Sequence, residues 1–260
     1  QCEYLQQEQI EQLNPFIHSK FEHAIYFPQI ANVRNPRLLQ SITAYLKQHP
    51  QVEFVEHCPV ERFNIANGQV QSIVAKNGKT YAADQFVIST GAWSQHWSEQ
   101  LDLAIPVRPV QGQMVLFKTP ENWLPTMCMN EVMYLIPRRD GHVVCGSSMA
   151  DCGFDTTPTA ASRQKILDAC FEMVPELAVF PIEKQWAGLR PGSPTGIPYV
   201  GKIPEMENLW ANFGHFRNGL CMGPASARLL RQLMLGQTAL VNPAAYSPER
   251  LKSETALMVH

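Results

Sequence analysis

Two short motifs in the C-terminal part of this 260-residue chain combine side chains and backbone suited to binding an anion. In residues 186–191, Trp-Ala-Gly-Leu-Arg-Pro, Arg190 lies between a leucine and a proline. A guanidinium held this way can donate two parallel hydrogen bonds to a carboxylate.

In residues 214–219, Gly-His-Phe-Arg-Asn-Gly, a glycine turn leads into an apolar helical run. The N–H groups and positive dipole at such a helix start favour an anion. Together the motifs predict a site for a small carboxylic acid beside a cofactor. The alternative for Arg190 is an ordinary surface or domain-bridging ion pair.

A predicted β-hairpin supplies two further candidates. If Asp140-Gly141 forms a two-residue type I′ turn, Tyr134 pairs with Ser147, and Met149 lies diagonally on the same face. A phenol and a thioether on one face could form a wall of a small pocket. The alternative is that both side chains only pack against a helix.

With these motifs in view, the chain resembles the D-amino acid oxidase type of flavoenzyme, and within it the glycine oxidases of thiamine biosynthesis. The resemblance covers nearly all of the sequence. It is carried by five motifs in the family's order, at residues 86–94, 106–113, 134–138, 186–191 and 214–219.

The resemblance implies roles for particular residues. Arg190 would clamp the substrate carboxylate, Tyr134 and Met149 would line the substrate pocket, and Arg217 could also reach the substrate. The implied contacts to non-covalent FAD come from Val60, Gly91, Gly214, His215, Phe216, Arg217, Asn218, Gly219, Leu220 and Cys221. For Val60 the alternative is a plain core valine. No metal site is expected.

The implied reaction is oxidative deamination of glycine or another small amine or D-amino acid. Hydride transfer to FAD would leave an imine that hydrolyses to keto acid and ammonia, and oxygen would be reduced to hydrogen peroxide. With glycine as substrate, the imine would be iminoglycine, which the resemblance implies is used to make the thiazole of thiamine. Two alternatives stay open: a D-amino acid dehydrogenase with a non-oxygen acceptor, and an inactive truncated fragment.

One departure from the family is large. The sequence has no G-x-G, whereas the family opens with a G-x-G-x-x-G turn that holds the FAD pyrophosphate, and the chain begins with Gln1. We therefore expect it to be the C-terminal two thirds or so of a longer enzyme.

Composition indicates a globular enzyme. A net charge of −2 argues against nucleic-acid or membrane-surface partners, and no apolar run reaches a membrane span of about 20 residues. The seven cysteines form no C-x-x-C pair, which favours a reducing cytoplasm. A homo-oligomer is left open.

The expected fold class is α/β (α+β overall): a Rossmann-like FAD-binding domain, with its N-terminal βαβ unit upstream, intertwined with an antiparallel-sheet substrate domain. The substrate domain is predicted at residues 1–33 and 107–185, and the FAD-binding domain at 34–106 and 186–260. In the first part of the chain we expect a helix capped by Asn35 and ending near Pro50, followed by strands at 52–55, 70–74 and 81–89 with turns at Asn67-Gly68 and Asn77-Gly78. A second helix is predicted at 160–173. An amphipathic helix is predicted after Gly223-Pro224, with Gln232 on its polar face.

Overall fold

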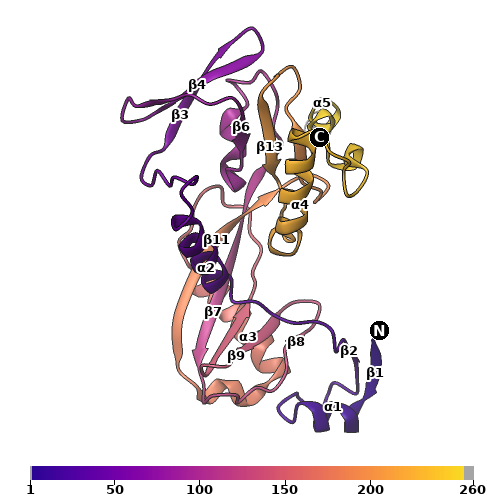
Figure 1. The fold of residues 1–260 in the computed structure, drawn as a ribbon. Coiled ribbons are helices and arrows are strands. Elements are labelled where there is room, and N and C mark those ends of the chain that lie inside the picture. Colours follow the sequence, from indigo (N-terminus) through magenta and orange to yellow (C-terminus); the bar gives the residue numbers. More distant parts are fainter. Residues whose placement is uncertain (1, 255–260) are drawn as a thin grey trace. The chain divides into compact units, whose positions relative to one another are not determined.

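The computed structural model of the chain describes residues 2–254, and it consists of two compact units (Figure 1). Unit 1 comprises Gln1–Val33 and Val110–Leu189, and unit 2 comprises Arg34–Pro109 and Arg190–His260. The chain crosses from one unit to the other three times. Two of these crossings, at 109/110 and 189/190, lie inside two different β-strands. The predicted domain ranges had their boundaries at 33/34, 106/107 and 185/186; residue 1 and residues 255–260 of those ranges lie outside the described part. Their assignment to substrate and cofactor stays a prediction.

Unit 1 is built on a five-stranded sheet with strand order β11-β7-β10-β9-β8, in which β7, β10, β9 and β8 pair antiparallel. A separate two-stranded antiparallel sheet, β1-β2, precedes it. Its elements are β1 (Glu3–Gln6), α1 (Gln7–Leu13), β2 (His23–Tyr26), β7 (Arg108–Lys118), β8 (Cys128–Met129), β9 (Tyr134–Arg138), β10 (His142–Gly146), α3 (Ala160–Met173), η2 (Pro175–Val179) and β11 (Ile182–Gly192).

Helix α3 packs on this sheet and lies where the sequence predicted a helix (Figure 1). The Thr159 hydroxyl caps it by accepting a hydrogen bond from the Ser162 N–H at 3.2 Å. Its buried residues, Ile166, Cys170 and Met173, recur at helical spacing and join Val115, Leu135 and Val143 of the sheet in one apolar core.

Unit 2 contains two three-stranded sheets, β12-β13-β6 and β3-β4-β5. Its elements are α2 (Asn35–Lys47), β3 (Val60–Ala66), β4 (Gln69–Ala75), β5 (Thr80–Tyr81), β6 (Phe86–Ile88), η1 (Gly91–Trp97), β12 (Tyr199–Lys202), β13 (Leu209–Phe213), α4 (Gly219–Met234), η3 (Pro243–Tyr246), η4 (Pro248–Arg250) and α5 (Leu251–Glu254).

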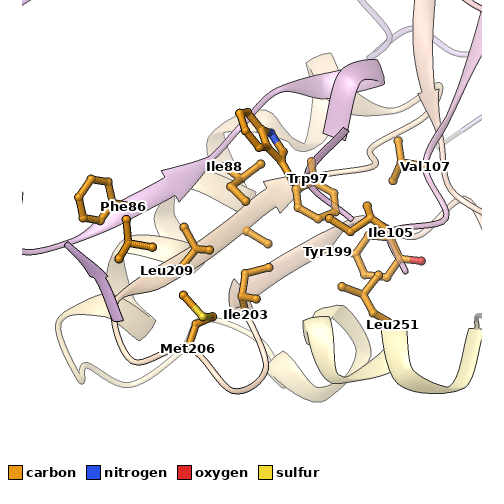
Figure 2. Packing of buried hydrophobic residues seen from close by; sticks show 13 residues of the cluster. Phe86, Ile88, Trp97, Ile105, Val107, Tyr199, Ile203, Met206, Leu209 and Leu251 are labelled. Atoms are coloured by element: carbon orange, nitrogen blue, oxygen red, sulfur yellow. The ribbon is translucent and has the colours of Figure 1, made fainter. Parts of the chain in front are cut away.

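The largest core of unit 2 lies on one face of the β12-β13-β6 sheet. Figure 2 shows Phe86 and Ile88 of β6 beside Leu209 of β13, with Tyr199 and Trp97 in the same cluster. On the other face, Val200 and Trp210 of the sheet pack with Leu229 and Leu230 of α4, so α4 covers that face. The mixed α/β architecture with antiparallel sheets confirms the predicted fold class. Within residues 2–254, none of the helices is both long and apolar enough to span a membrane.

Helix α2 departs from its prediction at the start. Its N-cap is Arg34, which makes no side-chain cap hydrogen bond, and Asn35 is the first helical residue. Pro36 occupies the first turn as predicted, because its missing N–H costs nothing there. No residue of α2 is buried, and Leu39 and Tyr45 are 62% and 69% exposed.

The strand predicted at residues 52–55 is wrong, because this segment has no regular secondary structure. The partner of β4 is β3, which the sequence reading missed. Asn67 and Gly68, with φ of 51° and 71°, form the two-residue turn between them, and Ala66 pairs with Gln69. A two-residue turn must join adjacent segments, so residues 52–55 could not be the partner. The strand predicted at 81–89 is two strands, β5 and β6, in different sheets.

The predicted helix after Gly223-Pro224 begins earlier, at Gly219, and Pro224 lies inside its N-terminal half. Gln232 was placed on the polar face, but it is 8% exposed and its Oε1 accepts a hydrogen bond from the Leu240 N–H at 3.0 Å. A buried amide is tolerated here because the following loop supplies its partner.

Candidate functional site

In unit 2, the carboxyl ends of two parallel strands bring two of the sequence motifs to one sheet edge. β6 and β13 are paired in parallel, with Phe86 opposite Leu209 and Ile88 opposite Ala211. Gly91 follows the last β6 pair by three residues, and Gly214 follows the last β13 pair by three. Ligands of open α/β sheets bind outside such carboxyl ends. The register therefore places both motifs where a cofactor would lie.

The turn after β13 can be formed only with glycine at its first position. Gly214 has φ of 78°, and a Cβ there would lie 3.1 Å from the Tyr199 ring and 3.4 Å from Val107. Tyr199 is fully buried, so it cannot move aside cheaply. Phe216 also has a positive φ, 47°. The turn is thus held in a conformation that L-residues seldom adopt.

The same turn is joined to the strand that carries the candidate arginine. The Phe216 N–H donates to the Pro191 carbonyl oxygen at 2.9 Å, and Pro191 directly follows Arg190. The Arg190 side chain is half-buried and that of Arg217 is exposed. The backbone therefore fixes the two arginine-bearing segments to each other, and their joint role in binding a carboxylate stays a prediction.

His215 fastens the turn to helix α4. Its Nε2 lies 2.9 Å from the Ser226 Oγ, two turns into the helix. Burial lowers the pKa of His215 below its usual 6.5, which favours the neutral ring. Gly219, Leu220 and Cys221, predicted as part of the turn, form the first turn of α4, and the last two are exposed. The N–H groups of that first helical turn have no intrahelical acceptor.

The lowered pKa of His215 predicts acid sensitivity. The unfolded chain binds a proton at His215 more readily than the folded chain, so the folded state loses stability as pH falls from about 6.5 toward the lower folded pKa. We expect the Tm advantage of the wild type over His215→Asn to shrink between pH 7 and pH 5, measured by thermal unfolding.

The matched control for this prediction is His49→Asn, at an exposed histidine. Its Tm difference from the wild type should be the same at both pH values. A His215→Asn difference that also stays constant would contradict the assignment.

In unit 1, the hairpin that carries Tyr134 has a different register from the predicted one. Arg138 pairs with His142, so the loop has three residues, and Tyr134 pairs with Gly146 rather than Ser147. Only Gly141 of the loop has a positive φ, 73°, whereas a type I′ turn requires two such residues. Because strand side chains alternate between faces, this one-residue slip takes Tyr134 off the face of the hairpin that it was predicted to share with Ser147.

Tyr134 and Met149 are therefore not joined by strand pairing, because β10 ends at Gly146. The Tyr134 hydroxyl donates to the Met114 Sδ at 3.4 Å. Met149 is 64% exposed, so it does not pack in the helix-covered core of unit 1. The pocket-lining role of both residues stays a prediction.

Gly146 leaves the space that the Met114 sulfur occupies. A Cβ on Gly146 would lie 2.2 Å from that Sδ, so Gly146→Ala must displace the thioether from the Tyr134 hydroxyl. Because the resemblance implies that Tyr134 lines the substrate pocket, we expect this variant of the complete protein to have a higher KM for the amine substrate that the resemblance implies. The Tm should fall only modestly, because the displaced atoms are the end of a flexible side chain.

The control is Met114→Leu, which conserves volume but removes the sulfur acceptor. It should reproduce the KM effect without steric displacement. If both variants keep the wild-type KM, the sulfur contact does not position Tyr134.

Val60 begins β3 and is half-buried against the main core of unit 2. Its side chain therefore behaves as a core valine. The backbone contact to FAD that the resemblance implies stays a prediction.

Residues 1–233 match the family model DAO, described as FAD dependent oxidoreductase. The chain belongs to this family. It is 46% identical over 235 residues to a glycine oxidase of Pseudomonas putida, covering 90% of this chain and 64% of that protein. A bifunctional protein ThiO/ThiG of Nostoc sp. is 28% identical over 263 residues, which cover 98% of this chain and 39% of that protein.

Solved structures show the same fold. The crystal structure of a glycine oxidase from Bacillus cereus matches with a TM-score of 0.84 and 27% identity, covering 92% of this chain and 67% of that one. The chain thus spans about two thirds of the length of these glycine oxidases.

The residues of unit 2 fit the FAD that the family description names. Gly91 has φ of 56°, and a Cβ there would meet no atom within 4 Å, so the backbone at this strand end is open to a ligand. The Ser193 Oγ and Asn212 Oδ1 are buried and have no hydrogen-bond partner within the described part of the chain. Ser193 follows Arg190 by three residues and Asn212 precedes Gly214 by two. Orphaned polar atoms beside both motifs indicate that a polar group belongs there.

The sequence reading missed Ser193 and Asn212. No local pattern could identify them, because an unpaired buried oxygen is a property of the packing.

Proposed function

We propose that the complete protein is an FAD-dependent amine oxidase that acts on glycine or a similarly small amino acid. The observation that carries the proposal is the shared edge of β6 and β13, where the Gly214 turn is hydrogen-bonded to the strand of Arg190. The 46% identity to a glycine oxidase supports this substrate class.

When bound, FAD would supply the two-electron oxidation of the substrate amine and the reduction of oxygen to hydrogen peroxide. Arg190 would bind the substrate carboxylate through its guanidinium, and Arg217 would add positive charge nearby. The first turn of α4 would present N–H groups and its positive dipole end to negative charge on the flavin ring.

For unit 1 we propose that the Tyr134 hydroxyl donates to a carboxylate oxygen of the substrate and that Met149 limits the size of the group on the α-carbon or nitrogen. The exposure of Met149 supports a role outside the core. No general acid or base is required if the amine binds in its neutral form, so catalysis would rest on positioning.

The product would be an imine, and we propose that iminoglycine supplies the thiazole of thiamine. The similarity to a ThiO/ThiG protein supports this step. We also propose a cytoplasmic location, supported by seven cysteines that are all free thiols.

The test is anaerobic addition of glycine to the full-length protein with FAD, followed by air. Loss of the visible flavin absorbance, then its recovery with release of peroxide, supports the proposal. Bleaching that air does not reverse would instead indicate a dehydrogenase with another acceptor. Absence of bleaching with glycine, sarcosine and small D-amino acids would rule out the substrate class.

A further inference from the structure

The segment that carries Met149 is fastened to strand β7 on both sides of this residue. The Gln111 N–H donates to the Ala150 carbonyl at 2.9 Å, and the Ala150 N–H donates back to Gln111 at 3.0 Å. The Gln113 N–H donates to the Ser148 Oγ at 2.9 Å, and its carbonyl accepts from the Ser148 N–H at 3.3 Å. Met149 is thus held between two residues that are each bound to a glutamine of β7.

The side chains of the same two glutamines form a buried network. Gln111 and Gln113 are 3% and 1% exposed. The Gln113 Nε2 donates to the Gln111 Oε1 at 2.8 Å, and the Gln111 Nε2 donates to the Asp155 carbonyl at 2.8 Å. The Gln113 Oε1 accepts from the Thr159 N–H at 2.9 Å and from the Gln185 Nε2 at 3.0 Å.

This network determines the path of the segment, because few side chains of the segment itself are buried. Met149 and every residue from 151 to 159 are exposed. An exposed stretch of this length has no core packing to fix it, so its hydrogen bonds to buried groups set its position. Those bonds are costly to break, because a buried amide left without a hydrogen-bond partner incurs the full free-energy cost of its desolvation.

Glutamine is suited to this position because one amide both donates and accepts. The Gln113 oxygen fixes the start of α3 at Thr159, while its nitrogen orients Gln111, which holds Asp155. The Met149 end of the segment is therefore bonded to the main chains of Gln111 and Gln113, and the end at Asp155 and Thr159 is bonded to their side chains.

We infer that Gln111 and Gln113 are positioning residues that set substrate size selectivity by fixing the Met149 segment. This inference rests on the proposed function, because it takes Met149 to line the substrate pocket. Neither glutamine contacts the substrate in this account. Their effect is transmitted through the segment that they hold.

The test compares Gln113→Met and Gln111→Met in the full-length protein with FAD. Methionine keeps the length and volume of the side chain but removes both amide functions. We expect kcat/KM for glycine to fall more than kcat/KM for N-ethylglycine, so that their ratio changes at least fivefold. The control is Gln164→Met, the same substitution at an exposed glutamine of α3, which should leave the ratio unchanged.

A merely structural role would lower both rates together, and an unchanged ratio in the folded variants overturns the inference. If Gln113→Met does not fold, Gln111→Met, which removes two side-chain hydrogen bonds, and Ser148→Ala, which removes one, are judged by the same ratio. A wild type that oxidises neither amine contradicts the proposed function instead.

A second readout does not depend on activity. Amide hydrogen exchange at Ser148 and Ala150 should accelerate at least tenfold in Gln113→Met, and should not change in Gln164→Met. Unaltered protection at both amides would overturn the inference even if the complete protein proved to be a glycine oxidase.

Discussion

Replacing Arg190 with alanine in the complete protein should weaken substrate binding by about 10- to 150-fold, which corresponds to the roughly 1.5–3 kcal/mol of a hydrogen bond to a charged group. Arg190 is the residue proposed to bind the carboxylate, and its segment is joined to the Gly214 turn through Pro191 and Phe216. Steady-state kinetics with glycine should show the loss mainly in KM.

Lysine at position 190 should recover little of this loss, because an ammonium cannot make the same planar pair of hydrogen bonds. Arg228→Ala, at an exposed arginine of α4, removes the same charge elsewhere in unit 2 and should leave KM near the wild-type value. The Kd of acetate, measured by perturbation of the flavin absorbance, should rise in parallel with KM. An Arg190→Ala enzyme with unchanged KM and acetate affinity would remove Arg190 from the site.

Gly214→Ala should lower stability by about 2–5 kcal/mol and reduce FAD affinity. The left-handed φ of 78° costs an alanine about 1–2 kcal/mol. The added Cβ would lie 3.1 Å from the buried Tyr199 ring, and overpacking typically costs about 1–3 kcal/mol more. Both effects act on the turn that is proposed to contact the flavin.

Gly78→Ala separates the two effects. Gly78 has φ of 82°, but a Cβ there would meet nothing within 4 Å, so only the conformational cost of about 1–2 kcal/mol remains. Thermal unfolding and FAD titration of both variants give the comparison. Equal losses of stability, or wild-type FAD affinity in Gly214→Ala, would contradict the packing argument.

Much of the fold follows from local sequence signals. The apolar spacing of α3 and its Thr159 cap define a helix of the predicted length, and the left-handed turn at Asn67-Gly68 marks a hairpin. Such features depend on a few neighbouring residues, so they can be inferred without knowledge of the rest of the chain.

The errors arose where a choice depended on distant partners. Asp140-Gly141 favours a two-residue turn locally, but the pairing of β10 with both β7 and β9 gives a loop of three residues. Residues 52–55 have strand-like composition, yet no strand of the described structure pairs with them. Strand propensity reflects packing against neighbours more than a property of the backbone.

In the candidate site, too, features with a local sequence signal were predicted and features that depend on distant residues were not. The motifs of Arg190 and Gly214 were visible because proline restricts the backbone and glycine allows a left-handed turn that other residues seldom adopt. The network of Gln111 and Gln113 was not, although both residues lie in a motif that had been noticed. Their partners Asp155, Thr159 and Gln185 come from separate parts of the sequence, and only folding brings them together.

The bond between the Phe216 N–H and the Pro191 carbonyl has a consequence for how the protein can diversify. Both groups belong to the main chain, so side-chain replacements at neighbouring positions do not delete the bond. Natural variation or directed evolution can therefore sample new residues beside Arg190 and Arg217 while the spacing of the two segments is retained. Libraries restricted to those neighbours should yield a high fraction of folded variants.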